Sequence, residues 1–452
     1  MRGYAVPRGG WRVFSVVPLR SRPRRAATVR APRDAGHVLH PSLGDRSRAA
    51  TPGRLLADIR PALWRFAPDA AASRAPADGI SLQADRRNGP GARAGAPESS
   101  GTGRAQGALG VIDVVSLDGQ RGAWDDFVAR ADGGSFCHLA AWRDILADVL
   151  GAECLYWAAV DDSGSWQGVL PLVRVRSRIF GHYLVSLPFL NDGGPLGAPA
   201  ARERLVAEAV SEARRTGADL LELRTRDATA GEASLSQSDR KITVVLPLPP
   251  VAESLFKAFP AKLRSQIRRP IKEGLTVRFG LEQREPFYEI FTRTMRDLGT
   301  PVLPAAFFDR IATAFPELVL FGVVYRGDEP LAAGCGFTWG REFEMTWAGS
   351  LRASRPIAAN MLLYWSFMEH VIGRGVSAFN FGRCTPGGGT HHFKRQWGGE
   401  DVPLAWSQWS SREVRATPSP DRPIYRAAAA VWRRLPLAMV NRLGPVLARR
   451  LP

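Results

Sequence analysis

The positions of apolar and polar residues predict an ordered series of elements from Val111 onward. Apolar residues recur at three- and four-residue steps over residues 140–150, which is the period of a helix, and Gly151 follows as a stop. Two apolar runs separated by a polar turn predict a hairpin. In chain order we expect a strand at 111–117, a helix at 140–150, strands at 154–160, 166–175 and 183–187, a helix at 201–215 and a strand at 220–223.

The same order of elements returns in the second half of the chain. The spacing predicts a helix at 305–315, strands at 318–325, 331–339 and 342–348, a helix at 359–372 and a closing strand at 379–381. Strand meanders followed by a helix that crosses to one more strand indicate mixed sheets with helices on their faces. We therefore expect an α/β fold that is built of two similar halves.

Length and composition allow two ordinary domains. The chain has 452 residues, of which 45% are apolar and 23% are charged, and one domain takes roughly 100–200 residues. These values exclude a fibrous or wholly disordered protein. We expect four segments: a disordered segment at 1–110, a first half at 111–250, a second half at 251–411 and a basic amphipathic tail at 412–452.

The first 110 residues are rich in Arg, Ala, Pro and Gly and show no sustained periodicity. Such a segment buries too little apolar area to offset its chain entropy, so we predict that it is disordered. Lys is absent from it, and no Met occurs between Met1 and Met295. Two interpretations stay open: a genuine basic tail, or translation from a mis-assigned upstream start.

The net charge of +18 is concentrated at the two ends of the chain. Residues 1–110 contain 19 Arg and 7 acidic residues, and residues 412–452 contain 9 Arg and 2 acidic residues. The segment between them is therefore nearly neutral. DNA binding by this central part is not expected, because it would need Lys and Arg concentrated there.

The cysteines and the apolar runs indicate a cytoplasmic protein. No two cysteines form a CxxC pair and all are far apart, so they do not make a disulfide framework, and a reducing compartment is expected. No apolar run approaches the roughly 18–20 residues that span a bilayer. The apolar stretch at residues 11–19 is too short and too interrupted for a secretory signal.

Arginines alternate with apolar residues in the C-terminal segment. Apolar residues occur at three- and four-residue steps from Ile424 to Val446, and we expect Pro436 and Pro445 to divide the segment into short helices. One interpretation is a helix that packs on the body of the protein. The other is an interfacial helix that gives peripheral contact with the anionic face of the inner membrane.

Candidate chemistry gathers in residues 379–398, FNFGRCTPGGGTHHFKRQWG. Gly387, Gly388 and Gly389 have no Cβ, so their N–H groups can approach a phosphate or an oxyanion. Arg383 follows the predicted strand and is suited to bind a phosphate or carboxylate through two hydrogen bonds. A flexible loop and a structural ion pair are the competing interpretations.

Further candidates lie beside these residues and in the first half. His391 and His392 are candidates for a general base, and they lack the spacing of a zinc site, so no metal is expected. Trp397 can pack or stack on a substrate. Asn191 and Asp192 in an NDGG turn are candidates to line a cleft between the halves, although turn chemistry alone also explains them.

Several stretches together resemble the FemAB-like family of bacterial transferases. Residues 379–398 are similar to the closing strand and glycine loop of that family, and residues 262–274 are similar to its basic helix. The stretches MRDLGTPV (295–302) and SLPFLNDGG (186–194) resemble the branch found beside exosortase/PEP-CTERM and exopolysaccharide loci.

This resemblance implies tandem GNAT-like acyltransferase domains, the second of the BioF2-like kind. It implies transfer of an acyl group to an amine or hydroxyl of a cell-envelope, exopolysaccharide or peptidoglycan precursor, which includes lipid-linked saccharides. The donor implied first is acetyl-CoA or another acyl-CoA, and the alternative donor is an aminoacyl-tRNA. A further alternative is a non-catalytic assembly partner in the polysaccharide or exosortase system.

The resemblance also assigns roles to single residues. Lys394 matches the Lys of the family's Phe-Lys element and is expected to stabilise the oxyanion of the reaction. Asn360 matches a family Asn and is expected at the cofactor, unless it only caps its helix. Arg264 and Arg268 lie on the basic helix, and the spacing there leaves two interpretations open: a solvated basic face, or contact with the phosphate of a donor or acceptor. Pro270 is expected to end or kink that helix.

Overall fold

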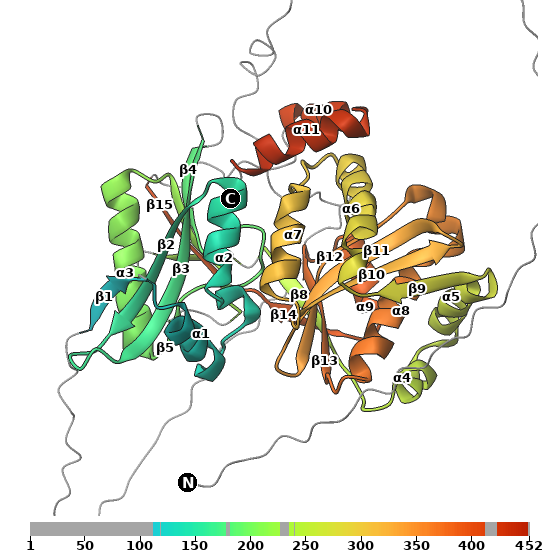
Figure 1. Cartoon of the computed structure of the whole chain (residues 1–452), viewed down its shortest axis with the longest axis horizontal. Coiled ribbons are helices and arrows are strands. Elements are labelled where there is room, and N and C mark those ends of the chain that lie inside the picture. Colours follow the sequence, from blue (N-terminus) through green and yellow to red (C-terminus); the bar gives the residue numbers. More distant parts are fainter. Residues whose placement is uncertain are drawn as a thin grey trace, which may run out of the picture. The chain divides into compact units, whose positions relative to one another are not determined.

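The computed structural model describes residues 112–117, 119–177, 181–226, 235–238, 240–411 and 423–450, with side chains from residue 426 onward in the last range (Figure 1). The prediction of disorder over residues 1–110 lies outside the described residues, and it stays a prediction. The remainder of this section concerns the described part.

The first sheet is built mainly from the first half of the chain. Its strands follow the order β1-β2-β3-β4-β6-β15-β7, and β5 pairs with β3. Only β4 and β6 run parallel among the described pairs, with residues 183–185 beside residues 220–222. The strands are β1 Asp113–Ser116, β2 Glu153–Val160, β3 Trp166–Ser177, β4 Gly181–Val185, β5 Leu196–Gly197, β6 Leu220–Leu223, β7 Ser236–Ser238 and β15 Trp406–Ser410.

The second sheet repeats this arrangement. Its strands follow the order β14-β8-β13-β12-β11-β10-β9. Here β12 and β13 are the parallel pair, with residues 342–344 beside residues 378–380. The strands are β8 Ile242–Pro247, β9 Leu275–Phe279, β10 Val319–Arg326, β11 Glu329–Trp339, β12 Glu342–Ser350, β13 Ala378–Cys384 and β14 Glu400–Pro403.

Helices cover both sheets (Figure 1). In the first half α3 packs on β2 and β3, and in the second half α6 packs on β11 and β12 while α8 packs on β10 and β11. The helices are α1 Arg121–Arg130, η1 Phe136–His138, α2 Ala141–Asp144, η2 Ile145–Val149, α3 Pro199–Thr216, α4 Ala252–Ala258, α5 Ala261–Lys272, η3 Leu281–Gln283, α6 Arg284–Leu298, α7 Ala305–Ala314, η4 Arg352–Ile357, α8 Ala359–Ile372, α9 Gly389–Arg395, α10 Pro423–Trp432 and α11 Leu437–Ala448.

Local sequence explains where the main helices begin and end. Pro199 occupies the first position of α3, and Gly217 follows its end with a left-handed φ of 65°. The helix α8 is apolar on nearly all sides because it lies between the second sheet and α5. The predicted α/β fold with two similar halves and mixed sheets is thereby confirmed.

The two sheets exchange strands across the predicted division of the chain. Strand β8 precedes residue 250 but lies in the second sheet, where it pairs with β13 and β14. Strand β15 lies at the end of the predicted second half but pairs with β6 in the first sheet. The boundary placed at residue 250 therefore does not separate the sheets, because each sheet needs a strand from the other side of that boundary.

Some elements differ from the predictions. The helices α1, α6 and α9 were not predicted, and α9 begins at Gly389 inside the stretch interpreted as a glycine loop. Pro270 does not end α5, which runs on to Lys272. Pro436 separates α10 from α11 as predicted, but Pro445 lies inside α11 and does not divide it.

Both halves contribute to one hydrophobic core. Phe136 of η1 and Phe337 of β11 stack with their ring centroids 4.4 Å apart. Trp142 of α2 lies 5.0 Å from the ring of Phe315 and 5.8 Å from that of Phe337. All four side chains belong to a single buried cluster. The halves are therefore joined by core packing, and we expect them to unfold together.

Phe337→Ala is expected to lower the free energy of unfolding by about 3–5 kcal/mol, because it leaves a cavity between the halves. Urea denaturation followed by far- and near-ultraviolet circular dichroism measures this loss, and the two probes should report one shared transition. Val251→Ala is the control, since Val251 is 54% exposed and should change little. Two separate transitions in the native protein would contradict a shared core.

Candidate functional site

A pocket of about 230 Å³ lies between the two sheets. Its walls come from the loop after α1, the loop after β4, the end of β6 and the strands β11 and β12. Aromatic rings of Phe136, Phe337 and Trp339 form its apolar side. Its charged lining consists of four carboxylates and two guanidinium groups: Asp132, Asp192, Glu342, Glu344, Arg202 and Arg226. This excess of carboxylates favours a cationic ligand.

The loop between β4 and α3 forms one wall of the pocket and lies directly against the end of β6. The Gly194 N–H donates a hydrogen bond to Arg224 O at 2.7 Å. A Cβ at Gly194 would lie 2.9 Å from that same oxygen and would clash with the Thr225 side chain. Only glycine permits this approach. The loop thereby holds Asn191 and Asp192 at the pocket.

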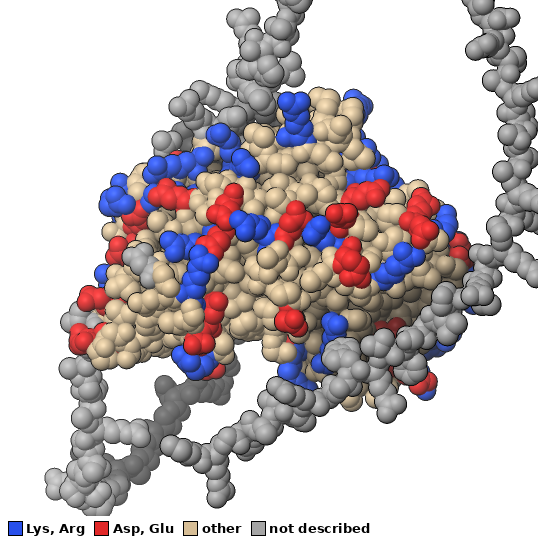
Figure 2. Space-filling view, viewed as in Figure 1, with Lys and Arg blue, Asp and Glu red and all other residues tan. Residues whose placement is uncertain are grey.

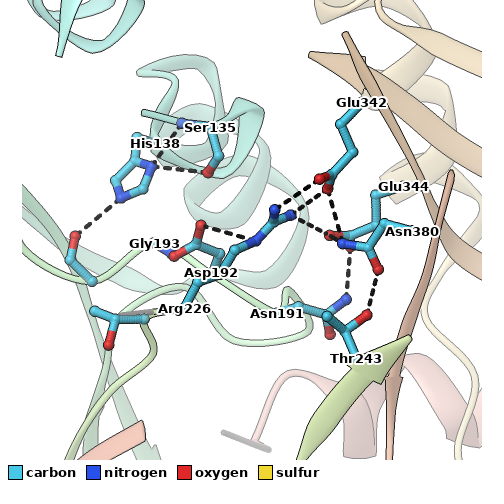
Figure 3. A network of polar contacts seen from close by, with 12 residues as sticks. Ser135, His138, Asn191, Asp192, Gly193, Arg226, Thr243, Glu342, Glu344 and Asn380 are labelled. Atoms are coloured by element: carbon cyan, nitrogen blue, oxygen red, sulfur yellow. Dashed lines mark hydrogen bonds and ion pairs between the residues drawn. The ribbon is translucent and has the colours of Figure 1, made fainter. Parts of the chain in front are cut away.

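A buried histidine joins η1 to the same loop (Figure 3). The Nδ1 of His138 accepts the Ser135 N–H at 3.2 Å, so the ring proton lies on Nε2, which donates to Gly194 O at 3.1 Å. Burial lowers the pKa of His138 below its ordinary value. The ring is therefore neutral at physiological pH, and its position in the pocket wall is defined by both nitrogens.

The Arg226 guanidinium lies among three carboxylates from both sheets (Figure 3). It donates to Glu342 at 2.7 and 3.1 Å and to Glu344 at 3.3 Å, and its Nε lies 3.9 Å from Asp192 Oδ2. Burial alone lowers the pKa of Arg226, but the hydrogen bonds and charge of Glu342, with the charges of Glu344 and Asp192, raise it above its ordinary value. Arg226 is therefore a permanent cation that links the two sheets.

Glu344 is the most deeply buried of these carboxylates. Its side chain is 3% exposed, and it accepts hydrogen bonds from Asn191 Nδ2 at 2.7 Å and Asn380 Nδ2 at 3.4 Å. Burial raises the pKa of Glu344, and the charge of Arg226 opposes that rise. Asn380 is itself fixed, because its Oδ1 accepts the Thr243 hydroxyl. Glu344 is thus fully engaged by protein groups.

Asp192 is the carboxylate that remains most available to a ligand. One of its oxygens accepts the Gly193 N–H at 2.8 Å. Within the described residues its other oxygen has no hydrogen bond, and Arg226 Nε lies 3.9 Å away. The side chain lines the pocket although it is only 8% exposed. A carboxylate in this position can accept a hydrogen bond and a proton from a bound group.

Sequence reasoning named two residues of this site and missed the others. Asp192 lines the pocket, and Asn191 donates to Glu344, which also lines it. No other named candidate lines the pocket within the described part of the chain. Glu342 and Glu344 alternate with apolar residues in a strand, which places both on one face and was a usable signal. Arg226 carried no such signal, because its main partner is 116 positions away.

Lys394 lies elsewhere, on α9. Lys394 is only 4% exposed. Its Nζ donates hydrogen bonds to Gly382 O at 2.7 Å and Arg383 O at 2.9 Å. These carbonyls belong to a bulge in β13, where Gly382 has a φ of 72°. Burial lowers the pKa of Lys394 to about 8. In this position the ammonium stabilises the bulge of β13.

The predicted base His391 is engaged within its own loop. Its Nδ1 accepts the Gly387 N–H at 3.0 Å, so its Nε2 carries the proton and donates to Asp401 at 3.0 Å. His392 is exposed, with its ring centroid 5.9 Å from that of His391. His391 therefore connects the turn before α9 to β14.

The predicted phosphate-binding glycines also bond within the chain. Besides the Gly387 N–H, the Gly388 N–H donates to Thr385 O at 3.2 Å. Gly389 begins the short helix α9. Asn360 is half-buried in the first turn of α8, a different part of the second half. In this conformation two of the three glycine N–H groups are already used by the protein.

Arg383 is largely buried behind the loop that carries Asn191. Its guanidinium lies over the Trp406 ring at 5.3 Å and donates to Leu190 O at 3.4 Å. Burial, and then the charge of Arg224, lower the pKa of Arg383 to about 9. Arg383 therefore contacts the neighbouring half, and it does not line the pocket.

The three remaining candidates have structural contacts in the second half. Arg264 donates to Lys257 O and Phe259 O at 2.9 Å, which caps the end of α4. Arg268 is exposed, and its guanidinium lies 5.0 Å from the centre of the Phe256 ring. Trp397 is 1% exposed and packs in the core of the second half. None of the three lines the pocket between the sheets.

Residues 261–395 match the family model of the acetyltransferase (GNAT) domain. This range runs from α5 to α9 and contains Glu342, Glu344 and Lys394. The second half is thus similar in sequence to GNAT acetyltransferases, as the FemAB-like resemblance implied.

Two known proteins are similar to parts of the chain. The UDP-N-acetylmuramoylpentapeptide-lysine N(6)-alanyltransferase of Weissella viridescens is 26% identical over 133 residues, which is 28% of this chain and 40% of that protein. The chain thus spans about two fifths of the length of this relative. The crystal structure of FemX superposes with a TM-score of 0.51 at 14% identity, over 70% of this chain and 100% of that chain. This likeness shows a shared fold.

Two further observations concern metals and membranes. The described ranges contain no group of three or more His, Cys, Asp or Glu side chains that could hold a metal ion. None of the helices in those ranges combines the length and the apolar character that crossing a bilayer requires.

Arg226→Met is expected to lower the free energy of unfolding by about 3–5 kcal/mol at pH 8, because buried carboxylates lose their cation. A carboxyl whose pKa is raised in the folded state favours folding while it is protonated, and this contribution is lost as the pH rises through its folded value. The pKa of Glu344 is already raised, and it rises further without Arg226. The loss of unfolding free energy should therefore be smaller at pH 5 than at pH 8. Urea denaturation at both pH values measures it.

The control for this experiment is Arg204→Met. Arg204 pairs with Glu208 at 3.0 Å on the surface of α3, and such pairs contribute about 0–1 kcal/mol. An equal loss for Arg226→Met at pH 5 and pH 8 would contradict the role assigned to the carboxylates.

Proposed function

We propose that this chain is an acyltransferase whose acceptor is an amine bound in the pocket between the two sheets. The observation that supports this most directly is Asp192, whose carboxylate lines the pocket with one oxygen available beside the Arg226 cluster. A primary amine is an ammonium ion at neutral pH, which suits a lining with more carboxylates than guanidinium groups.

The proposed reaction requires that the bound ammonium first lose a proton. Asp192 accepts this proton through its available oxygen, and the amine nitrogen then attacks the carbonyl carbon of the donor. The new C–N bond forms and the C–S or C–O bond of the donor breaks. The nitrogen, which is positively charged after the attack, gives its second proton to the leaving thiolate or alkoxide, and Asp192 releases the first proton to water. Glu342 and Glu344 are bonded to Arg226, so they position the site and do not serve as the base.

The acceptor class is proposed from the relatives. The name of the Weissella viridescens protein describes alanyl transfer to the N6 of a lysine in UDP-N-acetylmuramoylpentapeptide. We therefore propose a lysine-type amine on a cell-envelope precursor, of which peptidoglycan precursors are the first choice. An exopolysaccharide precursor, and a place in an exosortase/PEP-CTERM system, are supported only by the stretches at 186–194 and 295–302.

Two donors are proposed, each with its own support. The GNAT match over residues 261–395 supports acetyl-CoA or another acyl-CoA. The similarity to an alanyltransferase supports an aminoacyl donor, for which aminoacyl-tRNA is the candidate. We propose that Lys394 stabilises the bulge of β13, because its ammonium already donates to two carbonyl oxygens there.

Asp192→Asn is expected to lower kcat/KM for transfer to a lysine-type acceptor by about 10²–10⁴-fold, because the amide keeps the shape but cannot take the proton. Transfer of a radiolabelled acyl group measures the effect. Asp132→Asn is the matched control, since Asp132 lines the same pocket but is exposed. Full activity of Asp192→Asn would contradict the assigned base.

Thermal-shift binding of the full chain with acetyl-CoA, longer acyl-CoAs and charged tRNA is expected to identify the donor. Mass action raises the unfolding temperature only for a compound that binds the folded state. A shift with an acyl-CoA supports the first donor, and a shift with charged tRNA alone supports the second. No shift with any of them would contradict the enzyme and favour a non-catalytic assembly partner.

A further inference from the structure

The two C-terminal helices have one face buried on the second half. Val440, Gly444 and Ala448 recur every four residues on α11 and are buried. A Cβ at Gly444 would lie 2.8 Å from Val302 Cγ1, so this glycine lets α11 lie directly on the chain after α6. Arg433, which follows α10, donates to Leu298 O at 3.3 Å. The position of both helices is therefore defined by contacts on one side.

Large apolar side chains cover the opposite side of these helices. Met439, Leu443 and Val446 lie at steps of four and three residues on α11 and are 46%, 39% and 55% exposed. Val431 of α10 is 61% exposed. These four side chains are among the nine exposed large hydrophobic residues of the described part. Such clustering indicates a contact surface.

The charges on these two helices have a single sign. Residues 423–450 contain six arginines and neither Asp nor Glu. Those beside the apolar face of α11 are Arg442, Arg449 and Arg450, and all three are exposed. Figure 2 shows blue and tan atoms where Figure 1 draws α10 and α11, while red and blue alternate over the middle of the same view.

We propose that α10 and α11 lie on an anionic membrane surface, with the apolar side chains between the lipids and the arginines at the headgroups. Apolar residues on one helix face, surrounded by arginines, are the composition of an interfacial helix. The twelve residues of α11 extend over about 18 Å along the surface. This proposal does not depend on the proposed reaction.

Two other partners fit this surface less well. A second copy of the chain would bring the same arginines face to face across a two-fold axis, where like charges repel. A nucleic acid would bind the arginines but would leave the apolar side chains in water. A membrane surface has anionic headgroups with apolar acyl chains just below them, so it can contact both the arginines and the apolar side chains.

The experiment uses the full chain with Cys154→Ser and a solvent-sensitive fluorophore at Leu443→Cys. Vesicles of phosphatidylcholine, alone or mixed equally with phosphatidylglycerol, carry acyl chains with a nitroxide quencher. We expect quenching at position 443 with the anionic vesicles and much less with neutral ones. A label at Glu317→Cys, exposed and outside these helices, should not be quenched. The label reports locally, so binding through the 19 arginines of residues 1–110 does not mask the result.

Removing charge from the surface gives a second measurement. Arg442→Gln, Arg449→Gln and Arg450→Gln together should raise the lipid concentration that gives half of the quenching roughly 100-fold. Arg130→Gln, Arg326→Gln and Arg374→Gln remove the same charge from exposed positions elsewhere and should leave it unchanged.

Three results would overturn the proposal. The first is an unquenched label at 443 while the protein sediments with the vesicles. The second is an equal effect of both arginine triplets. The third is a label that becomes more buried as the protein concentration rises in the absence of lipid. This result would show that a second copy of the chain covers this face.

Discussion

The half-buried cation of Arg226 constrains how the two halves of this protein can meet. A guanidinium taken out of water costs several kcal/mol unless carboxylates surround it. Glu342 and Glu344 come from the second sheet, while Arg226 and Asp192 come from the first. Any sliding of one sheet over the other would separate these charges. The arrangement of the sheets, and the pocket between them, therefore depends on this cluster.

Apolar packing gives the same arrangement its stability. Phe136, Trp142 and Phe337 form a core that both halves share, and the exchanged strands β8 and β15 tie the sheets together through backbone hydrogen bonds. The pocket lies beside this rigid core, so its side chains are held in place before any ligand binds. Such preorganisation is what a transfer reaction requires of the groups that bind the acceptor.

The sequence predicted the fold better than the site. Helical and strand periods act over a few residues, so α3, α8 and most strands were visible from local patterns. The pairing of β8 and β15, and the contact of Arg226 with Glu342 across 116 positions, depend on tertiary structure and leave no local trace. The stretch 379–398 carried the FemAB-like resemblance, but its polar groups are used mainly for internal hydrogen bonds.

We propose that the acceptor binds between the sheets and not at the glycine-rich stretch of the second half. Hydrogen exchange followed by mass spectrometry tests it directly, with the full chain and the lysine-containing UDP-N-acetylmuramoylpentapeptide as the probe. The account predicts slower exchange on binding in peptides that cover residues 132–138 and 192–197, which line the pocket. Slower exchange confined to residues 383–397 would contradict it.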